Sequence, residues 1–385
     1  MSSPLRIVLC GDVMTGRGID QILPHPSDPT LHERWADTAL DYVRLAEQAN
    51  GPIPRGAGFN YPWGEALTAW RALAPDLVIA NLETAITRSD DYAPKGINYR
   101  MSPENLGCLT AAGLSACALA NNHVLDWGPG GLADTLAALA RAGVRTAGAG
   151  PDLAAARAPA VLETRSGARV LLIACASEDS GVPDDWAARD DRPGVNLVTP
   201  SDAEADAVAR DLAAVRRPGD VAVVSIHWGA NWGYEVAAAP RRFAERLIAR
   251  AGVSIVHGHS SHHAKGLGWF EGGLILYGCG DFLNDYEGIA GYAAYRGDLV
   301  AAYVTDFDAG GRVTGLDILP FQLRRFSLRT PTEPDLAWFR QRLDREAAKL
   351  GARVSTGPGG RLRLSAPPVS GLGADPRARW VRTEP

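Results

Sequence analysis

The sequence predicts a mixed α/β protein, and three observations lead to this prediction. Five short apolar runs lack polar alternation, which is typical of buried strands; they are Leu5–Cys10, Leu77–Ala80, Ala116–Ala120, Val221–Ile226 and Val253–Val256. Helical patterns lie between these runs, and strand–helix alternation indicates a layered architecture. Two hairpin patterns, over residues 161–174 and 299–319, add antiparallel strands, so a purely doubly wound sheet is not expected.

Composition limits the classes of function. With 385 residues the chain is long enough for one large domain or two. Its apolar content of 46% and charged content of 22% are ordinary for a globular protein, so disorder is not expected. The formal net charge of −5 argues against a surface that binds nucleic acid. We expect a small-molecule or oligomeric anionic substrate as the partner.

The N-terminal run and the cysteines indicate a cytoplasmic protein. Leu5–Cys10 is too short for a signal peptide or a membrane span, and no later stretch approaches about 20 uninterrupted apolar residues. The five cysteines are scattered without a CxxC motif, and four lie in apolar runs. This pattern is typical of reduced core thiols and argues against a zinc–thiolate site.

Two segments stand apart from the strand–helix pattern. Residues 24–62 are rich in Pro, Gly and His and form a long insertion with one amphipathic stretch, Trp35–Gln48. Residues 326–385 contain a charged amphipathic helix at Thr332–Leu350, two short strands and a tail rich in Pro and Gly. We therefore expect a catalytic domain over residues 1–325, with the insertion inside it, and a small C-terminal appendage.

Polar side chains typical of metal sites follow each of the five buried runs. In sequence order they are Asp12; Asn81 and Glu83; Asn122, His123 and Asp126; His227; and four histidines between His257 and His263. Ligands in α/β sheets bind outside the carboxyl ends of strands, so we expect these five segments to converge.

The ligand chemistry is consistent with divalent metal ions. Six candidates offer a mixed oxygen and nitrogen set: Asp12, Glu83, Asn122, His227, His259 and His262. Such a set suits Mn, Fe, Zn or Mg, and six ligands suit two ions better than one tetrahedral zinc. Taken singly, Asp12 is better explained as a helix cap and Asn122 as a turn residue, and His227 is explained equally well as a core histidine. The histidine cluster and the five strand ends together favour metal binding.

These motifs resemble a known family. Gly11-Asp12, Asn81-Leu82-Glu83, Asn121-Asn122-His123 with Asp126, His227-Trp228-Gly229, Gly258-His259-Ser-Ser-His262 and Tyr277-Gly-Cys-Gly-Asp281-Phe282 follow the order of the bacterial capsule-synthesis proteins of the CapA/PgsA type. That family is linked to poly-γ-glutamate production and belongs to the calcineurin-like metallophosphoesterase superfamily. The resemblance covers about residues 5–285.

The resemblance implies a four-layer αββα sandwich with two metal ions. Asp12 would hold one ion, Glu83 would bridge, Asn122 and His227 would hold the second, and His259 and His262 would divide between them. His123 would be the general acid, oriented by Asp126, and the i, i+3 spacing of these two residues is compatible with that role.

Three departures from the general phosphoesterase pattern concern the metal ligands. Met14 stands where a histidine is usual, Glu83 replaces an aspartate, and the last histidines are spaced HxxH, with His257-Gly-His259 as an alternative HxH pair. The first two departures leave fewer ligands for the first ion, so one tightly bound and one weakly bound metal are expected. Family members are also typically anchored by an N-terminal membrane segment, and we expect this chain to act without one.

Further residues are expected around the metal ligands. Substrate-binding candidates are Arg17, Lys95, Asn98, Arg100 and Trp228. Arginine can bind phosphate or carboxylate bidentately, but solvated or paired charges and a core tryptophan are the alternatives. Asn81, His257 and Asp281 are expected to orient the ligands.

Three functions remain open from sequence. The first is a metal-dependent hydrolase of phosphoesters or phosphoanhydrides. The second is a hydrolase or transferase acting on γ-glutamyl-type amide bonds. The third is a non-catalytic accessory protein whose metal site organises a surface. The presence of His123 and Asp126 argues against the third, since a structural site needs no proton donor.

Overall fold

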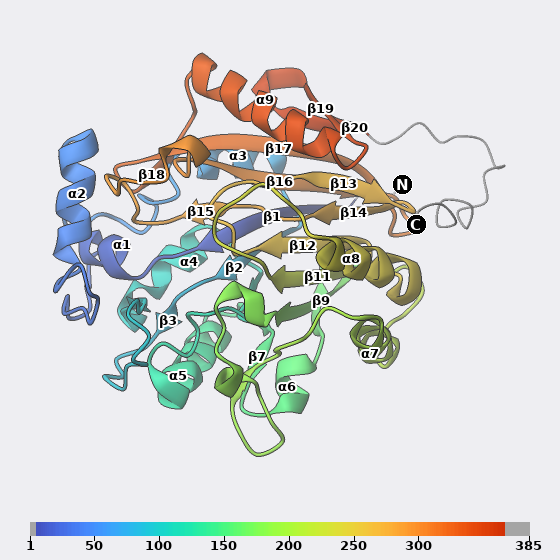
Figure 1. The fold of residues 1–385 in the computed structure, drawn as a ribbon, viewed down its shortest axis with the longest axis horizontal. Coiled ribbons are helices and arrows are strands. Elements are labelled where there is room, and N and C mark those ends of the chain that lie inside the picture. Colours follow the sequence, from blue (N-terminus) through green and yellow to red (C-terminus); the bar gives the residue numbers. More distant parts are fainter. Residues whose placement is uncertain (1–4, 366–385) are drawn as a thin grey trace, which may run out of the picture.

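The computed structural model describes residues 5–365, and the structural statements below concern this part of the chain. Two large β-sheets form the centre of the molecule, with helices on the outside (Figure 1). The larger sheet contains β1 (Leu5–Val13), β2 (Leu77–Leu82), β5 (Ala116–Ala118), β6 (Arg145–Ala147), β15 (Asp281–Leu283), β16 (Leu299–Phe307), β17 (Val313–Arg324), β18 (Ser327–Arg329), β19 (Arg353–Thr356) and β20 (Leu362–Ser365).

The second sheet has six strands in the order β13-β14-β12-β11-β9-β8. Their bounds are β8 (Ala160–Glu163), β9 (Arg169–Ala176), β11 (Val221–His227), β12 (Ile255–His259), β13 (Leu267–Phe270) and β14 (Gly273–Leu276). Two small two-stranded sheets pair β3 (Ala85–Ile86) with β4 (Arg100–Met101) and β7 (Ala149–Gly150) with β10 (Gly194–Val195). Both large sheets are mixed, because parallel pairs such as β1–β2 and β11–β12 join antiparallel pairs such as β16–β17 and β8–β9.

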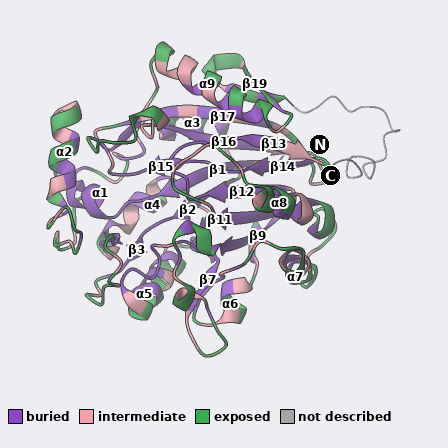
Figure 2. Ribbon diagram, in the orientation of Figure 1, coloured by how far each residue is buried: buried purple, intermediate pink, exposed green. Residues whose placement is uncertain are grey.

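The two large sheets face one another, since β1 contacts β12 and β5 contacts β9. Strands of both sheets contribute to one extended hydrophobic core. A second core lies between the six-stranded sheet and two helices, α7 and α8. Figure 2 shows the central strands buried, with exposed residues on the outer helices and loops.

The helices lie around the sheets. The α-helices are α1 (Arg17–Ile22), α2 (Leu40–Asn50), α3 (Ala66–Leu73), α4 (Gly107–Ala111), α5 (Gly128–Arg141), α6 (Leu153–Arg157), α7 (Asp202–Ala213), α8 (Ala238–Ala251) and α9 (Glu333–Ala348). Short 3-10 helices are η1 (Pro103–Leu106), η2 (Glu178–Ser180), η3 (Asp184–Trp186), η4 (Ala293–Tyr295) and η5 (Pro358–Gly360). Helix α5 packs against β3 and β6, and α9 packs against β19 and β13.

The five predicted strands and both predicted hairpins are confirmed, but several strands extend further than expected. The sequence pattern predicts that the polar ligands lie on loops after the strands. Instead, Asp12, Asn81, His227 and His259 are the last residues of strands or lie near their ends. The parallel ladders continue through them, pairing Asp12 with Asn81 and His227 with His259. Backbone hydrogen bonding therefore fixes these side chains more firmly than a loop would.

The insertion over residues 24–62 is less helical than its amphipathic pattern predicts. Helix α2 begins at Leu40, not at Trp35, and the side chain of Trp35 is 82% exposed. The backbone before the helix pairs with an earlier segment instead, because the Ala39 N–H donates to the Pro29 carbonyl and Thr38 forms a bridge with Thr30. The buried face of α2 packs against α1.

The C-terminal elements join the larger sheet. The predicted helix is confirmed as α9, and Thr332 caps its start by accepting a hydrogen bond from the Asp335 N–H. Both predicted short strands are present, and β20 pairs antiparallel with β17. The domain boundary near residue 325 stays a prediction, and the end of the tail lies outside the described residues. All five cysteines are buried and unpaired with one another.

Candidate metal centre

The predicted ligands meet at the carboxyl ends of strands from both large sheets. Strand β1 brings Asp12 from the larger sheet, and strands β11 and β12 bring His227 and His259 from the smaller one. His262 lies on the turn just after β12. Because the two sheets face one another, carboxylate and imidazole groups from different sheets come together in the interior. All four side chains are buried.

Within residues 5–365, two groups of buried side chains could each hold a metal ion: Asp12, His227 and His259, and Asp12, His262 and Asp281. In the first, the Nδ1 atoms of the two histidines lie 3.0 Å apart, and Nδ1 of His259 lies 3.5 Å from an Asp12 oxygen. In the second, Nδ1 of His262 lies 2.9 Å from an Asp281 oxygen. The ligand atoms of each group lie within 4.8 Å of one another, close enough together for the three residues to hold one metal ion.

Asp12 is common to both groups, whereas the resemblance implies Glu83 as the bridge. Glu83 lies beside the groups, with one oxygen 3.8 Å from Nε2 of His123 and the other 3.4 Å from the Asn81 amide nitrogen. Asp281, expected only to orient a histidine, also lies among the ligand atoms. The parallel pairing of β1 with β15 sets Asp12 beside Asp281 and explains this placement.

Asn122 offers an independent test of whether a cation fits. Its side-chain oxygen Oδ1 is buried and has no hydrogen-bond partner among the described residues. A buried polar atom without a partner costs free energy, and native proteins contain few of them. An amide oxygen is a suitable ligand for a hard divalent ion. The orphaned oxygen, next in the chain to His123, therefore fits a metal centre.

The pKa shifts of the carboxylates and histidines in the cluster are also consistent with a bound cation. Burial raises the pKa of Asp12 to about 7, and the charge of Asp281 adds to the rise. Burial and the charge of Asp12 raise the pKa of Glu83 well above its usual range. Burial lowers the pKa of His227 and His259 well below the usual value, so both imidazoles are neutral and able to bind metal. Crowded carboxylates beside neutral imidazoles would be stabilised by a positive ion.

Two asparagines hold the cluster in position. The Asn81 amide donates to an Asp12 oxygen at 2.8 Å, and the Asn121 amide donates to the Asn81 oxygen at 3.1 Å and to the Leu82 carbonyl at 2.8 Å. The oxygen of Asn121 in turn accepts from the His123 N–H at 3.0 Å. These bonds join the ends of β2 and β5 to Asp12. The expected orienting role of Asn81 agrees with this position.

His123 and Asp126 form a buried pair beside Glu83. Nδ1 of His123 lies 2.6 Å from an Asp126 oxygen, and that oxygen also accepts from the Tyr99 N–H at 2.6 Å. The Lys95 ammonium lies 2.9 Å from the other Asp126 oxygen and 3.3 Å from Nδ1 of His123. Burial lowers the pKa of His123 to about 4. The resting imidazole is therefore neutral, with Nε2 directed toward Glu83.

Arg17 is not free to bind substrate in this structure, contrary to the expectation from sequence. Its side chain is only 2% exposed and forms ion pairs with Asp285 and Glu33. The guanidinium also lies 3.5 Å from the ring centroid of Tyr42, whose hydroxyl donates to Glu33. Because two carboxylates surround one guanidinium, Arg17 joins the 24–62 insertion to the segment after β15.

Substitution of Arg17 by methionine is expected to destabilise the fold by about 3–5 kcal/mol, because two carboxylates would be left buried without their cation. Urea unfolding followed by circular dichroism measures this change. As a control, Arg250→Met removes an exposed pair with Asp206 and should leave the midpoint nearly unchanged. Unchanged stability of Arg17→Met together with a raised KM would instead show that Arg17 binds substrate.

The other substrate-binding candidates divide into one near the cluster and three engaged elsewhere. Lys95 reaches the His123–Asp126 pair, as described above. Arg100 donates to the Ser89 carbonyl and to Asp90 and lies over the Trp127 ring. The Asn98 amide donates to the backbone carbonyls of Ala93 and Asp126, so this residue shapes the loop that carries Lys95.

Trp228 lies on the wrong side of its sheet to contact a substrate at the cluster. It follows His227, and successive residues along an extended chain point to opposite faces. Its ring therefore belongs to the core under α8, where it stacks with Tyr277 and its indole N–H donates to the Tyr277 carbonyl at 2.9 Å. Its predicted contact with substrate is corrected accordingly.

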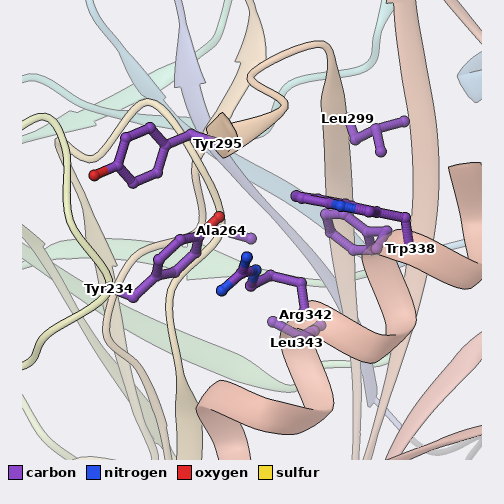
Figure 3. A pocket seen from close by; sticks show the side chains of 8 residues that line it. Tyr234, Ala264, Tyr295, Leu299, Trp338, Arg342 and Leu343 are labelled. Carbon is purple, nitrogen blue, oxygen red and sulfur yellow. The ribbon is translucent and has the colours of Figure 1, made fainter. Parts of the chain in front are cut away.

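Aromatic residues that the sequence does not single out surround the histidines. Trp232 stacks on Tyr292, with ring centroids 4.0 Å apart, and lies 5.4 Å from His262. Farther out, Tyr234, Tyr295 and Arg342 line a small pocket against α9 (Figure 3). Its volume of about 10 Å³ leaves room for about one water molecule, so it is too small for a substrate.

Two tyrosines, Tyr99, which is buried, and Tyr286, which is half-buried, also contact the site histidines. The Tyr99 ring lies edge-on to His123 with centroids 4.4 Å apart, and the Tyr286 ring lies edge-on to His262 at 5.1 Å. Their hydroxyls are 2.8 Å apart, and the Tyr286 hydroxyl is 3.5 Å from the sulfur of Met14. Tyr286 thus fills space beside Met14, where the related pattern has a histidine. Neither tyrosine follows one of the five apolar runs. The position of polar residues at strand ends, which predicts the ligands, therefore does not predict these tyrosines.

The fold and the buried cluster define a mixed α/β protein with a candidate metal centre between two sheets. The chain belongs to the family of the bacterial capsule synthesis protein PGA_cap, whose model matches residues 6–286.

Individual relatives agree with this membership. The chain is 48% identical over 362 residues to the probable polyglutamine synthesis accessory protein of Mycobacterium tuberculosis, covering 93% of this chain and 95% of that protein. It is 26% identical to the PGA biosynthesis protein CapA of Bacillus subtilis, covering 84% of this chain and 74% of that protein. Among solved structures, it is similar to a 5'-nucleotidase precursor from Thermus thermophilus, with a TM-score of 0.47, 17% identity, and coverage of 88% of this chain and 59% of that one.

Among residues 5–365, no helix is a candidate for a membrane-spanning segment. None combines the length and the apolar character needed to cross a bilayer.

Proposed function

We propose that this protein is a metal-dependent hydrolase that acts on a phosphoester or phosphoanhydride. One observation carries the proposal: two groups of potential metal ligands share Asp12 and lie beside the buried His123–Asp126 pair. A shared carboxylate suits two neighbouring ions, and an adjacent histidine suits proton transfer to or from a reacting group.

The two ligand groups would each hold one ion. His227 and His259 would share one ion with Asp12, and the orphaned oxygen of Asn122 would serve the same ion. His262 and Asp281 would share the other ion with Asp12, and Glu83 is a further carboxylate beside the groups. Divalent ions bound there would supply Lewis-acid activation of water and neutralise charge on the scissile group.

His123 would exchange a proton at Nε2. Asp126 accepts the hydrogen bond from Nδ1–H, which leaves Nε2 as the free nitrogen. Since burial lowers the pKa of His123 to about 4, the neutral form prevails at pH 7. The residue would therefore take up a proton before donating one to the leaving oxygen. Lys95 provides positive charge on the same side for an anionic substrate.

A second candidate is hydrolysis or transfer of a γ-glutamyl-type amide bond. It is favoured by the names of the relatives, which refer to polyglutamine synthesis and to PGA biosynthesis. The same Lewis-acid chemistry can polarise an amide carbonyl. In this case Lys95 would bind a substrate carboxylate in place of a phosphate oxygen.

Metal analysis followed by activity assays tests these proposals. The purified protein is expected to contain divalent metal close to two ions per chain and to hydrolyse an aryl phosphate mono- or diester. A metal-loaded protein that is inert to both esters but cleaves a γ-glutamyl anilide would favour the second candidate. A protein that takes up no stoichiometric Mn²⁺, Fe²⁺, Zn²⁺ or Mg²⁺ would contradict both.

A further inference from the structure

A buried asparagine, Asn284, contacts the second ligand group of the candidate metal centre. Its side-chain amide nitrogen donates to Oδ2 of Asp281 at 2.8 Å. The other oxygen of that carboxylate, Oδ1, lies 2.9 Å from Nδ1 of His262. Asn284 is only 2% exposed, so water does not compete for this hydrogen bond. Asn284 therefore binds one oxygen of a candidate ligand while the other oxygen faces His262.

The orientation of the Asn284 amide is fixed by the backbone two residues further on. Its oxygen Oδ1 accepts a hydrogen bond from the Tyr286 N–H at 3.0 Å. A backbone N–H can only donate, so the amide oxygen must face Tyr286 and the amide nitrogen must face Asp281. That nitrogen can only donate as well, so Oδ2 of Asp281 is the acceptor. The direction of both hydrogen bonds therefore follows from the donor and acceptor atoms themselves.

The residues on either side of Asn284 are both anchored. Before it, the Leu283 carbonyl accepts from the Met14 N–H at 2.8 Å, next to the parallel pairing of β15 with β1. After it, both oxygens of Asp285 accept hydrogen bonds from the buried Arg17 guanidinium. Because its neighbours are held, Asn284 has little freedom to move. The carboxylate of Asp281 that it binds is restricted in turn.

The other carboxylate of the second group is held in the same manner. The Asn81 amide donates to Oδ1 of Asp12 at 2.8 Å, and the Asn81 oxygen accepts from the Asn121 amide at 3.1 Å. Asp12 and Asp281 thus each have one oxygen bound by an asparagine amide. These donors are neutral, whereas a lysine or arginine in their place would compete with a metal cation for the carboxylates. Neutral donors orient the carboxylates and leave their negative charge for an ion.

We propose that Asn284 is a positioning residue that orients Asp281 for the ion held by Asp12, His262 and Asp281. This inference rests on the two-ion centre of the proposed function. Without the Asn284 amide, Oδ2 of Asp281 would lose its donor, and the carboxylate would be free to rotate away from His262. The other ligand group does not include Asp281, so its ion should be held as before. Loss of the amide is therefore expected to weaken one ion and not both.

Chelator competition with Zn²⁺ as the probe tests this role. Substitution Asn284→Ala is expected to weaken one of the two Zn²⁺ binding constants about tenfold to a hundredfold, the usual effect of removing a group that orients a metal ligand, and to leave the other unchanged. The control is Asn196→Ala, which removes a buried amide that donates to the Ala174 carbonyl at 2.9 Å instead of to a candidate ligand. This variant should bind both ions as the wild type does.

Two results of this experiment would overturn the inference while leaving the metal centre in place. The first is a pair of wild-type binding constants in Asn284→Ala. The second is an equal weakening of both ions, because that result would indicate a general effect on the structure and not the orientation of Asp281.

A measurement on the unmodified protein covers the case in which Asn284→Ala does not fold. In proton–nitrogen NMR spectra, the side-chain amide signal of Asn284 is expected to shift as Zn²⁺ fills the second group, whereas that of Asn196 should stay in place. An Asn284 signal that does not move when both ions are bound would overturn the inference. A wild type that binds two ions and shows the shift, but hydrolyses neither esters nor γ-glutamyl amides, would contradict the proposed function alone. A wild type that binds no Zn²⁺ would contradict both.

Discussion

Substitution of Asp12 by asparagine is expected to remove metal binding from both ligand groups and to lower kcat/KM at least about a thousandfold. Asp12 is the one residue that the two groups share, so its loss leaves each with two of its three ligands. The substitution also replaces a carboxylate by a neutral amide and so removes the negative charge that would attract the ions. A thousandfold loss corresponds to about 4 kcal/mol, which is within the several kcal/mol that metal ions supply in such sites.

Metal content and hydrolysis should be measured on the same preparation. The matched control is Asp306→Asn, which removes a carboxylate from the same sheet that pairs with Arg6 and lies outside both ligand groups. This variant should keep its metal and its activity. If Asp12→Asn retained two ions per chain, the shared role of Asp12 would be wrong.

The pH dependence of the metal-free protein gives an independent readout of Asp12. Its pKa is raised to about 7, mainly by burial, so the folded protein keeps a proton that the unfolded chain releases near pH 4. The stability from this proton is fully present below about pH 4 and is lost as pH rises through about 7. The stability of the wild type relative to Asp12→Asn should therefore fall as the pH rises from about 4 to about 7. Thermal unfolding in a chelator measures it.

Replacing His123 with glutamine is expected to lower kcat by about 10²- to 10⁴-fold while metal content stays unchanged. The residue lies beside the ligand groups but belongs to neither. Loss of a positioned acid–base group costs this much in enzymes that use one. Steady-state kinetics with an activated aryl ester should show a smaller loss than with a poor leaving group, because an activated leaving group needs less protonation.

A histidine that belongs to neither ligand group provides the control for this substitution. His32 is exposed and stacks on Tyr92 with ring centroids 3.6 Å apart. His32→Gln should leave kcat and metal content unchanged. If His123→Gln lost metal along with activity, His123 would be acting as a ligand and not as the proton carrier.

The sequence predicts the strands and their convergence because each buried run ends in a polar residue at the carboxyl edge of a sheet. Periodicity and strand ends are local properties, and local patterns identify Asp12, His227 and His259 directly. The division of these ligands between two sheets is not local. It depends on packing, and the placement of Asp281 beside Asp12 follows from a parallel pairing between strands far apart in the chain.

The substrate-facing residues could not be predicted because charge alone does not reveal a partner. Arg17 is indistinguishable in sequence from a phosphate-binding arginine, but its partners Glu33 and Asp285 come from the insertion and from the segment after β15. Ser225 on β11, whose hydroxyl oxygen lies 2.9 Å from Nε2 of His259 and 3.0 Å from Nδ1 of His257, could not be predicted for a related reason. A serine inside an apolar strand has no signature of its own, and only the register with β12 shows that it joins two histidines.

The parallel pairing of β1 with β15 determines when the centre can form during protein synthesis. Asp12 leaves the ribosome early, but its neighbour Asp281 follows only after both hairpin strands β8 and β9 and the β11–β14 segment have been made. Contacts of such long sequence separation form slowly, because loop closure must precede them. A nascent chain therefore carries Asp12 without most of its partners. In the proposed centre, metal ions would therefore bind only after the strands of both sheets have been made.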